Sequence, residues 1–265
     1  MRTIEEKRDY YSNGIQTGLH SLSAKGNLDA TLGLASNYAG LASTELHTNR
    51  NSANIAKRYF FKAARALQLY HWYQMDLYKP LYVDLNFKNL FIGPTISDLH
   101  LFLLCDHIEF KKDYYKSIEI PKKKSKHDGF CMAHAYKLLL EGEIEEAKTA
   151  LGDAYKKGDS STKDLGLVLG GIVHQDISLV EKGLDFRRKE TLRINNGVFP
   201  EDILISDRAT AWVKLAQQFG LEPDVSKGMI HEKILEHEDM EFEDIDEVYE
   251  AIGLEPIKRY PLRNY

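Results

Sequence analysis

Leu138-Leu-Leu-Glu-Gly-Glu-Ile144-Glu-Glu-Ala147-Lys-Thr-Ala-Leu151 is a stretch whose helical pattern recurs 33 residues further along the chain. Three pairs of apolar residues share this spacing: Ile144 with Ile177, Ala147 with Val180, and Leu151 with Leu184. Within each copy the steps of three and four residues place the apolar side chains on one face of a helix. A short break precedes each helix, at Glu141-Gly142 and at His174-Gln175. The length of the repeat is typical of helix-turn-helix units, which bury their apolar stripes against their neighbours.

The repeat predicts an all-α protein: a multi-helix bundle or stack with tetratricopeptide-like helical hairpins in the second half. Breakers and caps predict further helices over residues 4–24, from 27, over 51–78, from about 95 to 104, from 200 to 220, from 230, and from about 244. The 51–78 helix is apolar and aromatic on most sides, which predicts a place in the middle of the bundle. The chain is expected to form a single domain, 1–265, with an N-terminal lobe of about 1–120 and a C-terminal helical-hairpin lobe of about 127–256. The polar and basic segment Pro121-Lys-Lys-Lys-Ser-Lys links the two lobes.

Composition excludes several classes of protein. The 265 residues are 43% hydrophobic and 28% charged, which is ordinary for a globular protein. The formal charge of −5 lacks the basic footprint of a nucleic-acid binder. Cys105 and Cys131 are the two cysteines, too few for a secreted disulfide framework. The charged N-terminus resembles no signal peptide, and no apolar run approaches the ~20 residues of a membrane helix. We therefore expect a cytoplasmic protein that binds neither nucleic acid nor membrane.

The segment from Glu232 to Glu250 is strongly acidic, with Lys233 as its single basic residue. Apolar and aromatic residues alternate with the acids, among them Met240, Phe242 and Tyr249. A solvated acidic loop and helix face is the ordinary interpretation of such a run. The functional interpretation is a docking surface for a basic partner, in which charge steers association and an aromatic ring anchors it. This candidate interface comprises Glu232, Glu236, Glu238, Asp239, Glu241, Phe242, Glu243, Asp244, Asp246 and Glu247.

Catalytic and cofactor signals are weak. His127, Cys131 and His134 share helical spacing, with Cys105 and His107 as further ligands, but the spacing fits no standard zinc pattern. Burial of Cys131 and His134 between helices is the favoured alternative to a metal site. The sequence has no Gly-x-Ser-x-Gly elbow and no phosphate-binding loop, and the glycines from Gly166 to Gly171 predict close helix packing. We expect no enzyme activity, no metal and no cofactor.

Two segments resemble a known family. The first, residues 174–188, contains Gly183-Leu184-Asp-Phe-Arg187, and the second, residues 205–224, runs from Ser206 through an Ala/Leu-rich helix to Gly220-Leu221. Both are similar to motifs of the bacterial immunity protein 49 family, and the resemblance covers about residues 130–236. Where that family often has His before Arg, this chain has Phe186-Arg187-Arg188.

The resemblance implies an immunity protein of a polymorphic toxin system. Such a protein binds a cognate toxin domain, an effector of type VI or contact-dependent secretion, and neutralises it in the cytoplasm by steric occlusion. If the toxin is a nuclease, its surface is basic, and the acidic 232–250 segment is the expected meeting point. Two other classes stay open. One is a tetratricopeptide-like adaptor or chaperone for an endogenous protein, and the other is a helical enzyme with a metal at His127, Cys131 and His134.

Overall fold

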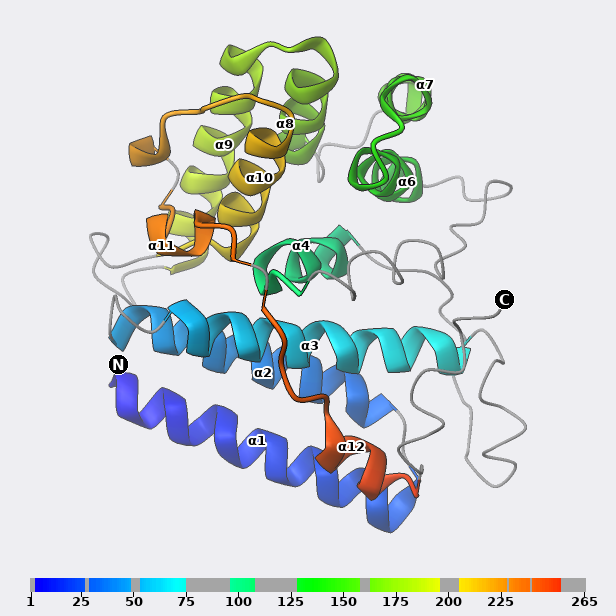
Figure 1. The fold of residues 1–265 in the computed structure, drawn as a ribbon, viewed down its shortest axis with the longest axis vertical. Coiled ribbons are helices and arrows are strands. Elements are labelled where there is room, and N and C mark those ends of the chain that lie inside the picture. The colour runs from blue at the N-terminus through cyan, green and yellow to red at the C-terminus, as the bar shows by residue number, and fades with distance from the viewer. Residues whose placement is uncertain are drawn as a thin grey trace. The chain divides into compact units, whose positions relative to one another are not determined.

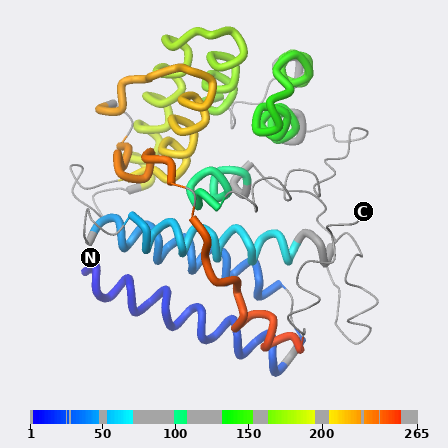
Figure 2. The backbone as a smooth tube through the Cα atoms, viewed as in Figure 1, coloured from blue at the N-terminus to red at the C-terminus, as the bar shows by residue number. Residues whose placement is uncertain are grey.

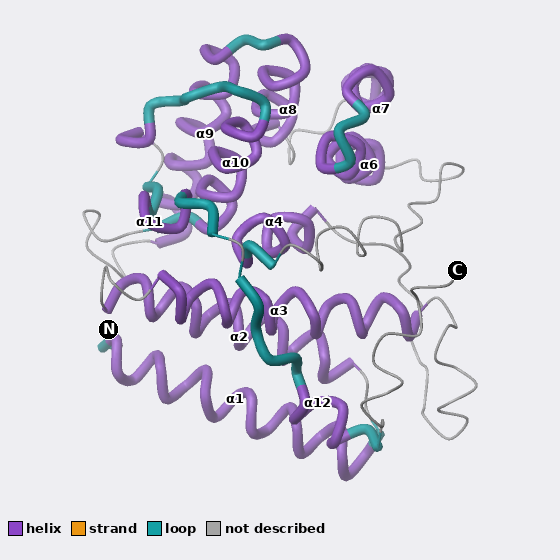
Figure 3. Tube along the Cα trace, in the orientation of Figure 1, coloured by secondary structure: helices purple, strands orange, loops and turns teal. Residues whose placement is uncertain are grey.

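The computed structural model describes residues 3–26, 29–48, 53–74, 96–107, 128–157, 163–195, 205–227, 229–238 and 240–253. Within these ranges every regular element is a helix, and strand-like pairing is limited to an isolated parallel bridge between His107 and Met240 (Figure 3). The predicted all-α fold is confirmed. Among the helices that the structure describes, none has the length and hydropathy needed to cross a membrane.

The chain forms two compact units that are interleaved in sequence. Unit 1 contains residues 1–93, 105–117 and 238–265, and unit 2 contains residues 94–104 and 118–237. The division therefore differs from the two sequential lobes expected from the sequence, because the acidic tail after residue 238 groups with the N-terminal helices. The reason is electrostatic: this tail pairs with basic side chains on a helix of unit 1, as described below.

Unit 1 is built on three long helices, α1 (Ile4–Lys25), α2 (Asp29–Thr48) and α3 (Ala53–Gln74), with α2 packed against both of the others (Figure 1). The short helix α12 (Asp246–Ala251) contacts α1. Thr3 and Glu6 form a capping box at the start of α1, and Gly26 ends the helix with a φ of 56°. Left-handed backbone of this kind favours glycine, so the predicted end of the first helix is confirmed.

Most of α3 is buried, as its aromatic composition predicts, although α2 is the helix that packs against both of its neighbours. The fully buried apolar side chains of α3 include Phe60, Phe61, Ala63 and Ala64. The helix is described from residue 53 to 74, and the predicted continuation to residue 78 lies outside the described residues. Three polar side chains of the helix are buried as well: Lys57, Arg65 and Gln68. Burial of a cation costs free energy unless an opposite charge pairs with it. Lys57 and Arg65 therefore favour segments that bring a carboxylate to α3.

Unit 2 contains α4 (Ile96–Cys105) up to residue 104, α6 (Asp128–Leu140), α7 (Ile144–Lys157), α8 (Lys163–His174), α9 (Ile177–Asn195) and α10 (Asp207–Gln218). A 3₁₀ turn (Val225–Lys227) and the short α11 (Glu232–Leu235) follow. The consecutive helices α6 and α7 pack against each other, as do α8 and α9, and α10 lies beside α9 (Figure 2).

The 33-residue repeat is visible in the backbone of unit 2. Ile144 and Ile177 are the first residues of α7 and α9. The breaks before them are also equivalent, because Gly142 and Gln175 both have left-handed backbone, with φ of 82° and 54°. Even the closing hydrogen bonds match: the N–H of residue 143 donates to the carbonyl of 138, and that of 176 to 171, both at 2.8 Å. The repeat is confirmed, whereas a tetratricopeptide-like class for these helix pairs stays a prediction.

Glycines let α8 and α9 approach closely. A Cβ on Gly171 would lie 2.6 Å from Val180 Cγ2 and 2.7 Å from the carbonyl oxygen of Asp176. On the facing helix, a Cβ on Gly183 would lie 2.7 Å from the carbonyl oxygen of Asp164. The contacts at Gly171 confirm the predicted close helix packing at that end of the Gly166–Gly171 cluster.

Candidate functional site

The acidic segment is divided between the two units. Glu232 and Glu236 belong to unit 2, in and just after α11, and both are exposed. Glu238, also exposed, is the first residue of the tail of unit 1. Asp239 lies outside the described residues. The rest of the predicted interface lies within residues 240–250, which we call the acidic strap.

The acidic strap alternates between inward and outward side chains at its start. Met240, Phe242 and Asp244 are partly covered, whereas Glu241 and Glu243 between them are exposed. Alternation with a period of two is typical of extended backbone. The N–H of Met240 donates to the carbonyl of Asp106 at 3.4 Å, which anchors the strap where it begins. The inward side of the strap therefore packs on the rest of unit 1, and its outward side faces solvent.

Arg65 of α3 and Asp244 of the strap form a bidentate ion pair. Arg65 Nε donates to Asp244 Oδ1 at 2.9 Å and Nη2 to Oδ2 at 2.8 Å. Nη2 also donates to the hydroxyl oxygen of Tyr249 at 2.6 Å, and Nη1 to the side-chain oxygen of Gln68. The Arg65 side chain is 1% exposed and that of Asp244 is 8% exposed. The two charges neutralise each other, and the guanidinium group makes further hydrogen bonds to Tyr249 and Gln68. Burial of two charges is tolerated under these conditions.

Glu247 makes the second link, one turn further along the strap, in α12. Its Oε1 accepts hydrogen bonds from Lys62 Nζ at 2.6 Å and from the Tyr38 hydroxyl at 2.7 Å. Burial acts to raise the pKa of Glu247, but the hydrogen bonds from Lys62 and Tyr38 outweigh it and hold the pKa below its usual value. Burial, and then the charge of Glu247, raise the pKa of the Tyr38 phenol. At neutral pH the carboxylate is therefore ionised and the phenol is the donor.

A buried ion pair and an aromatic cluster lie at the start of the strap. Lys57 Nζ is 2.8 Å from Asp106 Oδ2, with side chains 1% and 0% exposed. The next residue, His107, stacks on Phe61 with ring centroids 4.7 Å apart. Phe242 of the strap lies 5.8 Å from the same phenylalanine ring. The strap is thus fixed to α3 by apolar as well as ionic contacts.

Sequence reasoning missed the partners of the strap. Arg58, Lys62 and Arg65 recur at steps of four and three, so they share one side of α3. In an otherwise aromatic helix this basic series is a detectable signal, and it indicates an acidic segment packed alongside. The partner could not be located from sequence, because the strap lies more than 170 residues away, as the separation of 179 between Arg65 and Asp244 shows.

The outward face of the strap is acidic. We define it by four exposed residues: Glu241, Glu243, Asp246 and Glu250. Glu243 is 2.6 Å from Arg58, but the two side chains are 81% and 47% exposed. An exposed pair of this kind contributes about 0.2–1 kcal/mol and is readily exchanged for another partner. The outward face therefore offers carboxylates to a basic surface while the inward face holds the strap in place.

No protein-family model fits the sequence, and no curated protein or solved structure is significantly similar to it.

The histidines and cysteines considered as metal ligands are separated or lie outside what is described. His127 and the side chain of Cys131 are not among the described residues, and His134 is half-buried on α6. Cys105 is a buried thiol at the end of α4, and His107 stacks on Phe61 in unit 1. Over the described ranges, no three His, Cys, Asp or Glu side chains gather in a way that could hold a metal ion.

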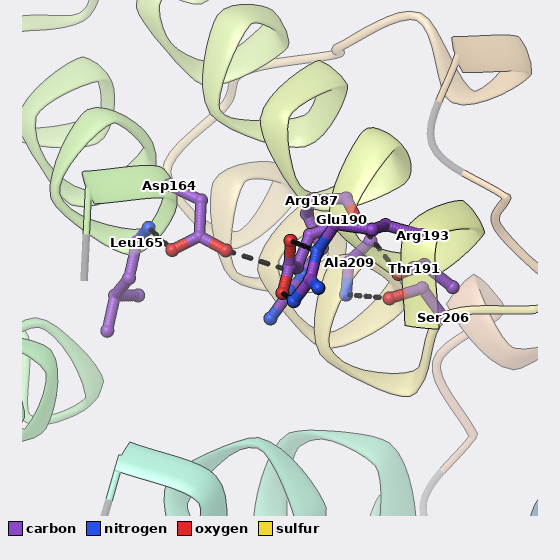
Figure 4. A network of polar contacts seen from close by, with 8 residues as sticks. All are labelled: Asp164, Leu165, Arg187, Glu190, Thr191, Arg193, Ser206 and Ala209. Atoms are coloured by element: carbon purple, nitrogen blue, oxygen red, sulfur yellow. Dashed lines mark hydrogen bonds and ion pairs between the residues drawn. The ribbon is translucent and has the colours of Figure 1, made fainter. Parts of the chain in front are cut away.

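Figure 4 shows polar contacts of unit 2 in which Arg187 and Ser206 take part, one residue from each of the segments 174–188 and 205–224. Arg187 of α9 pairs with Asp164 of α8 at 3.3 Å, with both side chains largely covered. Asp164 also accepts the N–H of Leu165 at 2.9 Å, at the start of its own helix. Ser206 caps α10 by accepting the N–H of Ala209 at 3.3 Å. The residues that carry the resemblance, Arg187 and Ser206 included, thus serve helix pairing and capping.

Proposed function

We propose that this protein is an immunity protein that binds a cognate antibacterial toxin, an effector of type VI or contact-dependent secretion, and neutralises it by steric occlusion. The observation that carries the proposal is the outward face of the acidic strap, whose carboxylates are presented on backbone that buried ion pairs hold rigid. The resemblance of residues 130–236 to immunity proteins supports the same function. Binding of this kind takes place in the cytoplasm and needs neither a cofactor nor a catalytic group.

Rigidity matters because tight association is limited by the entropy of ordering flexible groups. A surface that is already fixed before binding avoids part of this cost. Here the strap is ordered by contacts at Met240, Phe242, Asp244 and Glu247, so its outward carboxylates need little reorganisation. Several negative charges on one face also accelerate association with a basic toxin, such as a nuclease domain.

Within the predicted interface, we expect the exposed carboxylates to serve binding and the covered residues to serve folding. Glu241, Glu243 and Asp246 face outward and are the expected toxin contacts in unit 1. Phe242, Asp244 and Glu247 contact α3 or α2, so their replacement acts first on the stability of the strap. The exposed Glu232 and Glu236 belong to the other unit.

The proposal is tested by co-expressing the full chain with the product of the gene immediately upstream in its source genome. We expect a stable complex and rescue of cells from the toxicity of the upstream product. Reversal of three outward charges, Glu241→Lys, Glu243→Lys and Asp246→Lys, should slow association at low salt by at least about tenfold. The matched control is Glu145→Lys with Glu146→Lys, two exposed carboxylates on α7. An upstream product that neither binds nor poisons cells would contradict the immunity function.

A second candidate, an adaptor or chaperone for an endogenous protein, is favoured by the regular repeat in unit 2. Repeated helix pairs build extended binding surfaces, and the breaks of the two copies share three equivalent backbone hydrogen bonds. An adaptor would bind its partner through residues 128–195, and charge reversal on the strap would leave that binding unchanged. The same co-expression experiment therefore distinguishes the two functions.

A further inference from the structure

The exposed side of α9 carries basic side chains around one aromatic ring. Its residues follow one another at steps of four, three and four, so they lie on one side of the helix. All are exposed, and we call them the α9 face: Lys182, Phe186, Lys189 and Arg193. The opposite side of α9, which includes Val180 and Leu184, is buried within unit 2. The α9 face is thus the solvent side of a helix whose other side is fixed.

Phe186 is the apolar centre of this face. Its side chain is 37% exposed, which is unusual for a phenylalanine in a packed helix pair. Lys163, the first residue of α8, places its Nζ 4.9 Å from the ring centroid. The neighbouring Arg187 pairs with Asp164, which ties α9 to α8 at the next residue along the helix (Figure 4). An exposed aromatic ring on a rigid support is typical of an anchor residue in an interface.

The charge of α9 is positive. The helix has five basic residues, Lys182, Arg187, Arg188, Lys189 and Arg193, and three acidic ones, Glu181, Asp185 and Glu190. Asp185 contacts Lys189 at 2.7 Å and Glu190 contacts Arg193 at 2.6 Å, both within the helix and at the surface. Exposed pairs of this kind are weak and can be exchanged for the carboxylates of a partner. The α9 face is therefore electrostatically suited to an acidic ligand.

The chain itself shows what binds to such a face. On α3, Arg58, Lys62 and Arg65 follow the same steps of four and three as residues 182, 186 and 189. That series pairs with three carboxylates of the strap, Glu243 and Asp244 before α12 and Glu247 within α12. Phe242, next to these carboxylates, packs near Phe61. In α9 the helical series is similar, but its basic and aromatic side chains face solvent.

We propose that the α9 face is a docking surface for an acidic, extended segment of a partner protein that carries an aromatic side chain. Carboxylates of the segment pair with Lys182, Lys189 and Arg193, and its aromatic ring packs on Phe186. The site belongs to unit 2, whereas the acidic strap belongs to unit 1. It takes a ligand of opposite charge to that of the strap and does not depend on the immunity function.

The test measures binding of a labelled peptide to the full-length protein by fluorescence anisotropy. The probe is an 11-residue peptide with the sequence of residues 240–250, the acidic segment for which this chemistry is seen. We expect saturable binding that weakens as salt is raised. Lys182→Glu combined with Lys189→Glu should weaken binding at least tenfold, and Phe186→Ala should do so at both low and high salt. Lys148→Glu, an exposed lysine on α7, is the matched control and should change binding less than twofold.

Three results would overturn the proposal. The first is no binding of the peptide, and the second is binding that the α9 variants leave unchanged, as exchange with the strap on α3 would give. The third is tighter binding of a single-stranded oligonucleotide of the same charge, lost in the same variants, which would assign the surface to nucleic acid. Unfolding curves of each variant serve as the check on folding, since the three replaced residues are exposed.

Discussion

Arg65 shows how a single residue decides the structure around it. Its guanidinium group reaches Asp244, Tyr249 and Gln68 from the middle of an aromatic helix. Without the carboxylate the buried cation would be unpaired, and without the cation the strap would bury an unpaired carboxylate. Removing one partner of such a pair is more damaging than removing both, because the remaining charge stays in an apolar environment.

We therefore expect Arg65→Ala to lower the free energy of unfolding by about 3–5 kcal/mol, the range for breaking a buried pair. Urea denaturation followed by circular dichroism measures the loss. The control is Arg58→Ala, whose partner Glu243 is exposed, and its cost should stay below about 1 kcal/mol. The double variant Arg65→Met with Asp244→Leu should be more stable than Arg65→Ala alone. A loss below about 1 kcal/mol in Arg65→Ala would show that the ion pair is not buried in solution.

Glu247 makes the attachment of the strap dependent on pH. Its pKa is below the usual value of 4.5 in the folded protein, so the ionised form stabilises the fold. This contribution is fully present above pH 4.5 and is lost as the pH falls through the folded pKa. The stability difference between the native protein and Glu247→Gln should therefore shrink on acidification. Urea unfolding at intervals from neutral pH downward measures it; a constant or growing difference would contradict the assignment.

At the scale of the element, the pairing of α8 with α9 depends on glycine. An alanine methyl group at position 171 would meet backbone atoms of Asp176 and Val180, which cannot move aside as a flexible side chain would. The equivalent position in the first copy of the repeat is Leu138, so the two helix pairs share a register but not a packing distance. Small residues thus distinguish two copies that otherwise follow the same pattern.

Gly171→Ala should destabilise the protein by about 1–3 kcal/mol, the usual cost of inserting a methyl group into a filled contact. Gly152→Ala is the matched control in α7, because no neighbouring atom lies within 4 Å of the place that its methyl group would take. There the better helix propensity of alanine should raise stability by about 0.5–1 kcal/mol. Thermal unfolding of both variants provides the comparison, and effects of the same sign would argue against close packing of α8 and α9.

At the scale of the whole molecule, the chain builds unit 1 from segments at both of its ends. The strap comes from beyond residue 238, yet its contacts are with α3 and α2, which end by residue 74. Unit 1 is therefore complete only when the last part of the chain has been added, whereas unit 2 is formed by residues 94–104 and 118–237.

A chain that ends at Glu238 should lose protection from hydrogen exchange in α3, because Lys62 and Arg65 would lose their carboxylates. Amides of α8 and α9 should keep most of their protection, since the two helices belong to unit 2 and pack against each other. Hydrogen exchange read by mass spectrometry distinguishes the two groups of peptides. Equal loss of protection in both would show that the units do not unfold independently.

Local pattern determined much of this protein. Helix type, the 33-residue repeat, the left-handed break at Gly142 and the caps at Ser206 and Gly26 all follow from residues close together in the chain. The free energies of these helices, turns and caps depend on contacts between residues a few positions apart. Such residues can be recognised in the sequence itself.

Only the tertiary structure decided the role of the acidic segment. From the sequence, all the residues of the predicted interface were equal candidates for binding. In the structure, Phe242, Asp244 and Glu247 face α3 or α2. Glu241 and Asp246 face solvent. Which carboxylate is buried depends on a cation more than 170 residues earlier, as the 179-residue separation of Arg65 and Asp244 shows. Long-range pairs of this kind are set by how the helices pack, since ionic attraction acts through space and carries no signature in the neighbouring sequence.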